Sequence, residues 1–251
     1  MRLATILFCV SVASAVLGQT ATTPTEEGYW ENTSIKVGIN TYSGDTDSTN
    51  LTIHADWNAC VGLLESDFDF DSSFHTALHT DFIDQQKLDW ALRRKFRPHS
   101  KWFAMVHTWA EHQESKGIDL RVAIGPGIGV HLIDNKRTRV TLETGVALTR
   151  EEHDDGVDQD YTAIFFDGNW DWVINERTKL DHDTKFRLNT DDTDDLRIYS
   201  ETDLSYQITK TVLALTVGVV LSYDARPVRG HKEMNVETHT MLKIIFAGKS
   251  K

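Results

Sequence analysis

The chain has 251 residues, with 26 lysines and arginines against 38 aspartates and glutamates, so its formal net charge at pH 7 is −12. Hydrophobic residues make up 40% of it, which is too apolar for a disordered chain and enough for one large β domain or two small ones. The acidic balance argues against a nucleic-acid binder, and the two cysteines, Cys9 and Cys60, can form neither a disulfide framework nor a metal site of standard spacing.

Residues 1–18 have the layout of a secretory signal peptide. Arg2 supplies a positive charge, residues 3–10 are apolar, and small residues follow, with Ala15 and Gly18 as alternative cleavage points. The alternative is a buried first strand or helix. We expect a signal peptide over 1–18, an N-terminal segment over 19–33, one β domain over 34–246 and a tail over 247–251.

The segment after residue 34 has a period of two, which is the signal of β-strands. In the clearest stretch Val122, Ile124 and Ile128 share one face, while Arg121 and His131 fall on the other. Turn-forming residues divide the chain into about twelve predicted strands. They cover residues 34–42, 51–58, 66–77, 85–96, 102–112, 119–132, 138–150, 161–174, 179–189, 196–208, 211–224 and 234–246.

The predicted connections fall into two alternating classes. Short basic turns alternate with longer, mostly acidic loops, and this alternation is typical of a meander that threads a bilayer with its short turns on the periplasmic side. No other segment has the roughly 18–20 apolar residues that a transmembrane helix needs, so any insertion must be by strands. The short turns are 97–101, 134–137, 175–178 and 209–210; the acidic loops are 43–48, 151–160 and 190–195, and the loop 225–233 is of mixed charge.

Three features indicate that the apolar face of the strands points outward to lipid and not inward to a protein core. The polar face is charged, aromatic residues stand near the ends of the apolar faces, and closure of an even number of strands removes sheet edges. We therefore predict an all-β fold, a single antiparallel up-and-down transmembrane β-barrel of about 12 strands. The aromatic residues are Trp57, Trp102, Trp170, Trp172, Tyr206, Tyr223 and Phe246; the charges expected in the lumen are Arg121, Glu143, Lys185, Arg187, Arg197, Glu201, Glu237 and Lys243.

Three stretches resemble a known family. Residues 125–145 (GPGIGVHLIDNKRTRVTLETG), 193–228 (TDDLRIYSETDLSYQITKTVLALTVGVVLSYDARPV) and 43–57 (SGDTDSTNLTIHADW) are similar to the salt-induced outer-membrane proteins, catalogued as domain of unknown function 481. The resemblance implies an outer-membrane barrel of a Gram-negative bacterium, with membrane lipid, lipopolysaccharide and the barrel-insertion machinery as partners. It carries over no catalytic residue. The chain departs from the family at residues 58–66, and in the residues 247–251 that follow the terminal aromatic Phe246.

Few residue groups suggest chemistry. His99 and Ser100 are adjacent on a predicted turn, where chance adjacency explains them better than a nucleophile and its base. Four histidines on neighbouring strands fit no standard metal spacing, and the GPGIG segment lies in a strand, where glycines relieve crowding or bend the sheet. We therefore predict no catalytic residue, cofactor or metal ligand with a strong signal. The histidines are His75, His79, His107 and His112.

Two acidic loops are weak candidates for binding divalent cations, which prefer carboxylate oxygens. Surface aspartates are also ordinary turn residues that keep strand edges apart, and this interpretation is the better one. The candidates are Asp154, Asp155, Asp158 and Asp160 in one loop and Asp191, Asp192, Asp194 and Asp195 in the other.

The expected function is that of an outer-membrane β-barrel without enzymatic activity, either a narrow channel or an envelope component. A role in the response to salt or osmotic stress is implied by the family resemblance alone. Lumenal charges such as Glu143, Lys185 and Asp203 would line a charge-selective channel or plug the lumen by pairing with one another. The alternatives are an outer-membrane enzyme of the phospholipase or protease type and a secreted soluble barrel that binds an apolar ligand.

Overall fold

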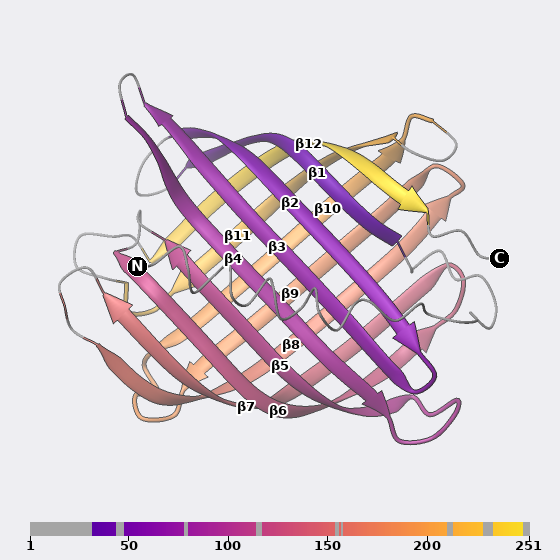
Figure 1. The fold of residues 1–251 in the computed structure, drawn as a ribbon, viewed down its shortest axis with the longest axis horizontal. Helices are drawn as coiled ribbons and strands as arrows, with labels where there is room; N and C mark the ends of the chain where they lie inside the picture. The colour runs from indigo at the N-terminus through magenta and orange to yellow at the C-terminus, as the bar shows by residue number, and fades with distance from the viewer. Residues whose placement is uncertain are drawn as a thin grey trace.

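Twelve antiparallel strands form one closed barrel in the computed structural model, which describes residues 32–43, 48–77, 80–113, 117–153, 156, 158–209, 213–227 and 233–247 (Figure 1). Each strand pairs with its neighbours in the chain, and β1 closes the barrel on β12. The strands are β1 (Asn32–Ser43), β2 (Ser48–Val61), β3 (Leu64–Ala77), β4 (Thr80–Lys95), β5 (Trp102–Gln113), β6 (Ile118–Asp134), β7 (Thr138–His153), β8 (Gln159–Asn175), β9 (Thr178–Asn189), β10 (Leu196–Gln207), β11 (Leu213–Asp224) and β12 (Met234–Ala247).

The predicted fold class is thus confirmed, with twelve strands. The paired strands reach from residue 32 to residue 247, slightly beyond the expected 34–246. The expected signal peptide over 1–18, nearly all of the segment 19–33, and residues 248–251 of the tail lie outside the described residues. Among the residues that are described, no helix is long and apolar enough to cross a membrane.

Local turn chemistry explains the tight connections at one end of the barrel, which we call the short-turn end. Gly62, between β2 and β3, has a φ of +63°, a conformation that costs glycine little. Between β6 and β7, the Asn135 side-chain oxygen accepts hydrogen bonds from the backbone N–H groups of Arg137 (2.9 Å) and Thr138 (3.0 Å). The β3–β4, β5–β6, β7–β8, β9–β10 and β11–β12 connections lie at the opposite end, the long-loop end.

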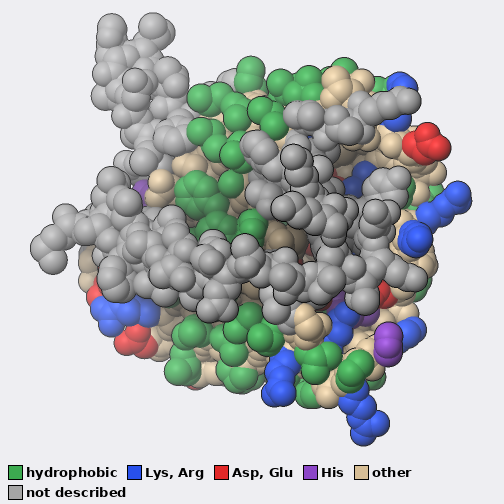
Figure 2. Space-filling view, turned by 45° about the vertical axis from the view of Figure 1, so that its right-hand side comes forward, with side chains coloured by type: hydrophobic (Ala, Val, Ile, Leu, Met, Phe, Trp, Pro, Cys, Tyr) green, Lys and Arg blue, Asp and Glu red, His purple; other side chains and the backbone are tan. Residues whose placement is uncertain are grey.

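The outer face of the barrel is apolar. Ile124 and Leu148, for example, leave 52% and 71% of their surface exposed. A continuous apolar surface of this kind is unfavourable in water but is typical of the lipid-facing side of a membrane barrel. Figure 2 shows such hydrophobic side chains in groups over the surface. Of the aromatic residues expected near the membrane interfaces, Trp102, Trp170, Trp172 and Tyr206 are exposed near the short-turn end, and Tyr223 is exposed near the long-loop end.

The inner face carries an apolar cluster that the sequence did not predict. Phe103 and Phe165 are fully buried inside the barrel, beside glycines of β6 and β7. A Cβ atom on Gly127 would lie 2.9 Å from the Phe165 ring, and one on Gly145 would collide with both that ring and the backbone. Gly127 therefore relieves crowding, as expected of the GPGIG segment, and both glycines make room for the Phe165 ring. The cluster consists of Ala91, Phe103, Met105, Trp109, Ala123, Ala147 and Phe165.

Candidate functional site: the charged lumen

Many charged side chains line the inside of the barrel. Alternation along each strand places all the charged residues that we expected in the lumen on the inward face, opposite the exposed apolar residues. Two of them, Arg121 and Glu143, are almost fully buried. The eight are Arg121 on β6, Glu143 on β7, Lys185 and Arg187 on β9, Arg197 and Glu201 on β10, and Glu237 and Lys243 on β12.

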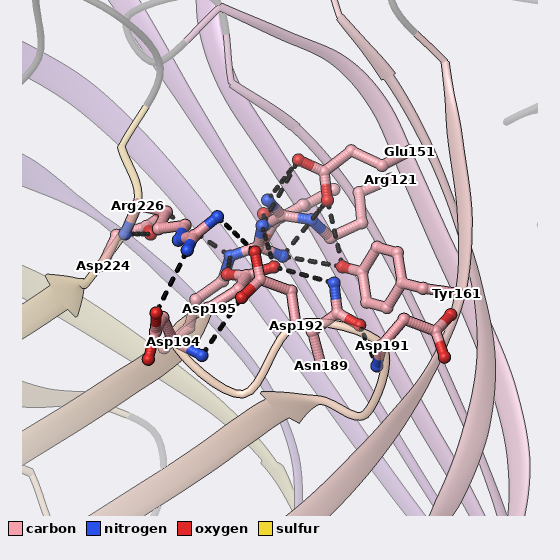
Figure 3. A network of polar contacts seen from close by, with 12 residues as sticks. Arg121, Glu151, Tyr161, Asn189, Asp191, Asp192, Asp194, Asp195, Asp224 and Arg226 are labelled. Carbon is pink, nitrogen blue, oxygen red and sulfur yellow. Dashed lines mark hydrogen bonds and ion pairs between the residues drawn. The ribbon is translucent and has the colours of Figure 1, made fainter.

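Glu151 is the centre of a network near the long-loop end (Figure 3). Arg121 donates from Nε and Nη2 to the two Glu151 oxygens at 2.7 and 2.8 Å, and Tyr161 donates from its hydroxyl at 3.0 Å. Arg197 donates to Glu151 at 3.1 Å and to the Tyr161 hydroxyl at 2.7 Å. Because Arg197 lies on β10 and Glu151 on β7, this network joins strands that are not neighbours in the sheet.

Arginines next to the acidic loops pair with several of the described aspartates. Arg226, after β11, pairs with Asp192 and, at 3.2 Å, with Asp194, so it ties together the β9–β10 and β11–β12 connections (Figure 3). Arg150 on the outer face pairs with Asp158 at 3.2 Å and lies 3.8 Å from Asp160. These pairs favour the interpretation of the aspartates as loop residues over that of a cation site.

The remaining loop candidates are placed as follows. Asp195 is buried and lies 3.2 Å from the Arg197 guanidinium. The backbone N–H of Asp191 donates to the Asn189 side chain at 2.9 Å. Asp154 and Asp155 lie outside the described residues.

Two contacts cross the middle of the lumen. Lys185 on β9 donates to Asp89 on β4 at 2.7 Å, although four strands separate β9 from β4 on the shorter way around the barrel. Lys87 on β4 lies 4.7 Å from the ring centroid of Tyr199 on β10, and five strands separate these two in either direction. Side chains from opposite walls therefore meet, and they narrow the lumen at this level.

His107 lies beside this crossing. Its Nε2 is 2.7 Å from Asp89 and its Nδ1 is 3.4 Å from Asp167, which also pairs with Arg187. The Arg187 guanidinium in turn lies 4.5 Å from the Trp109 ring centroid, a cation–π contact. Nearer the short-turn end, Arg93 of β4 binds Glu143 of β7 and Asp67 of β3.

The register of the strands aligns carboxylates with carboxylates on both walls. Asp56, Asp69 and Asp89 stand directly opposite one another along β2, β3 and β4. Like charges directly opposite one another destabilise a sheet, so these rows cost stability where they are not neutralised. The facing wall, formed by β8, β9 and β10, has the rows Asp171–Asp181–Asp203 and Asp183–Glu201.

Lysines offset only part of this acidity. Lys36 lies 3.0 Å from Asp203, and Lys179 lies 3.0 Å from Asp171. The side chain of Asp69 lies 3.5 Å from His54 Nδ1 and remains half exposed. Sequence reasoning missed the rows because only the register shows which residues are opposite one another.

The other sequence candidates are not brought together. The Ser100 hydroxyl donates to the Trp102 carbonyl at 3.0 Å and accepts from its N–H at 3.1 Å, so it shapes the β4–β5 turn, where His99 has a φ of +63°. His112 is bound to the Asp119 carbonyl at 2.8 Å and has no contact with His107 among the described residues. The side chain of His75, and all of His79, lie outside the description.

Comparison with known proteins agrees with this architecture. The family described as "Protein of unknown function, DUF481" matches residues 35–246, and no curated protein matches the chain. A solved structure of the NanC porin has a TM-score of 0.58 at 9% identity, covering 85% of this chain and 100% of that one. The translocator domain of the autotransporter NalP from Neisseria meningitidis has a TM-score of 0.50 at 9% identity, covering 98% and 96%. At such identities the likeness shows the fold alone.

Proposed function

The chain belongs to the DUF481 family of proteins of unknown function, and from this membership and the geometry of its lumen we propose that it is an outer-membrane channel, narrow and cation-preferring. The observation that carries the proposal is the contact between Lys185 and Asp89 across the lumen, in a wall that is otherwise rich in carboxylates.

The outer face supports the proposed location. An apolar belt flanked by exposed tryptophans and tyrosines matches the girdles by which barrels contact the two membrane interfaces. Lipid, lipopolysaccharide and the insertion machinery are the partners that this location requires. The membrane fraction, run on a denaturing gel unheated beside boiled, should give a faster band that shifts on boiling. Recovery in the soluble periplasmic fraction without such a shift would contradict the location.

The carboxylate rows support the preference for cations. Rings of aspartate and glutamate select cations in channels because they replace part of the ion's hydration and repel anions. Asp69 and Asp89 face the lumen from one wall, and Asp181 and Glu201 face it from the other. Rows of like charges lower the stability of the sheet, so a functional role would account for their presence. Attraction of counter-ions into the lumen is such a role.

The narrow pore follows from the side chains that meet in the lumen. With Lys185 on Asp89 and Lys87 over Tyr199, a hydrated solute has to displace these groups or pass beside them. Small cations are therefore better candidates for passage than large solutes.

Replacement of Lys185 tests the proposal. Lys185→Met removes the bridging ammonium, so the single-channel conductance in a planar bilayer should rise and the preference for cations should increase. Arg150→Gln is the matched control, because it removes one positive charge from the outer face and leaves the lumen unchanged. A folded Lys185→Met barrel with unchanged or lower conductance would count against a channel narrowed at this point.

A second candidate is a non-conducting envelope component that acts under salt or osmotic stress, the role that the family resemblance implies. The buried ion pairs that join non-adjacent strands, such as Arg93–Glu143 and Arg197–Glu151, favour it because they would stiffen and fill a barrel. Wild-type protein with the gel shift and no measurable conductance would favour this role over that of a channel.

A further inference from the structure

We propose that Glu201, Asp203 and His239 form a binding site for a divalent transition-metal ion on the lumen wall. Glu201 and Asp203 project from the inner face of β10, two residues apart, and His239 projects from β12. One ligand atom from each residue lies within 4.8 Å of the other two, the only such group among the described side chains. The three donors therefore converge on one point.

The strand between the ligands is shaped for this approach. Gly218 on β11 stands directly opposite Asp203 on one side and His239 on the other. A Cβ atom there would collide with the Asp203 carboxylate and lie within 2.7 Å of two atoms of the His239 ring. The glycine lets the two side chains meet over β11, where His239 Nε2 is 2.6 Å from Asp203 Oδ1.

Each carboxylate is oriented by a different outer group. The Tyr199 hydroxyl donates to Glu201 Oε2 at 2.6 Å, while Oε1 faces His239 Nε2 at 4.0 Å. The Lys36 ammonium donates to Asp203 Oδ2 at 3.0 Å, while Oδ1 faces His239. Outer partners that hold one oxygen and direct the other toward a shared point are the usual support of metal ligands.

The donor set and its surroundings define the class of ion. One imidazole and two carboxylates suit Zn²⁺ and its first-row neighbours better than Ca²⁺ or Mg²⁺, which prefer oxygen ligands alone. Asp183 and Asp181, directly opposite Glu201 and Asp203 on β9, add negative potential. Three protein ligands leave a coordination position open, and the partly exposed Glu201 side chain, at 24%, gives the ion access from the lumen.

His107 provides a natural comparison within the same lumen. It also lies near two carboxylates, but Asp89 faces its Nε2 and Asp167 faces its Nδ1. The two oxygens approach opposite sides of the ring and cannot converge with one nitrogen on a single ion. His107 is therefore the matched control for His239.

The test uses untagged full-length barrel folded in detergent, with Zn²⁺ binding measured by calorimetry and Cu²⁺ by electron paramagnetic resonance. For the wild type we expect one saturable Zn²⁺ site, and a Cu²⁺ resonance spectrum with hyperfine coupling to the nitrogen of one imidazole. His239→Gln should lower the affinity by more than about tenfold, whereas His107→Gln should bind as the wild type does. Tyr199→Phe should weaken binding by about tenfold, because Glu201 loses the donor that orients it.

Absence of saturable binding, equal affinity in His239→Gln, or equal losses in His239→Gln and His107→Gln would each overturn the assignment. Glu201→Gln replaces His239→Gln if the latter fails to give a heat-shifted band. None of these measurements involves ion conduction, so failure of the metal site and failure of the proposed channel are distinguishable.

Discussion

Replacing Glu151 by glutamine should destabilise the barrel far more than the same replacement at the next residue. Glu151 is 2% exposed and accepts hydrogen bonds from Arg121, Tyr161 and Arg197, with His153 at 3.0 Å. An amide has half the acceptor oxygens of a carboxylate and no charge, so the variant leaves two inward-facing guanidinium groups with a weaker partner.

The expected loss of stability depends on which carboxylates remain beside each arginine in Glu151→Gln. Removing one member of a buried ion pair costs about 3–5 kcal/mol when the other charge is left uncompensated. Arg121 still pairs with Glu111, and Arg197 still lies 3.2 Å from Asp195 and 3.4 Å from Asp224. The expected loss in the free energy of unfolding is therefore at the low end of that range, about 3 kcal/mol.

Glu152 is the control, since it has the same side chain one position further along β7 and points to the opposite face. It is 40% exposed and pairs with Arg150 at 3.2 Å. Exposed ion pairs contribute about 0–1 kcal/mol, so Glu152→Gln should unfold almost as the wild type does. Urea titration of the barrel in lipid vesicles, followed by tryptophan fluorescence, measures both variants under the same conditions. Equal losses in the two variants, or a loss below about 1 kcal/mol for Glu151→Gln, would refute the inward orientation and the buried network.

Two further changes probe the wall and the loops in the same titration. Gly145→Val places side-chain atoms against both the Pro126 carbonyl and the Phe165 ring, so it should cost about 3 kcal/mol or more. Gly168→Val, whose nearest contact is Leu142 at 3.5 Å, should cost less than about 0.5 kcal/mol, and equal costs would contradict the close packing at Gly145. Arg226→Gln removes exposed pairs to Asp192 and Asp194 and should change stability by less than about 1 kcal/mol, so a larger loss would mean that these loops contribute to the stability of the barrel itself.

The strand pattern was predictable because alternation is a local property. Each predicted strand corresponds to an observed one, and the largest error is at β4, which begins at Thr80 and not at residue 85. There a bulge shifts the pairing, so that Ser73 faces Gln85 while Phe74 faces Ile83. A bulge reverses the side-chain alternation, which removes the period-two signal at the start of the strand.

The inner surface was predictable only in part. Its charges could be assigned from alternation, but Phe103, Trp109 and Phe165 contradict the expectation of a polar lumen. Phe103 and Trp109 alternate in step with His107 on β5, and Phe165 alternates in step with Asp167 on β8, so their inward direction could have been recognised. The packing of Phe103 against Gly129, and of Phe165 against Gly127 and Gly145, needed the register. The carboxylate rows and the contact of Asp203 with His239 across Gly218 likewise depend on the stagger of several hairpins, which no local pattern contains.

Ion selectivity of the wild-type barrel tests the proposed channel most directly. The protein is reconstituted in a planar bilayer, and the reversal potential is measured across a gradient of potassium chloride. An acidic, bridged lumen should give a small conductance with a reversal potential of the sign that cation permeation produces. A reversal potential of the opposite sign would contradict the role assigned to the carboxylate rows, and a properly folded barrel with no conductance would contradict the channel itself.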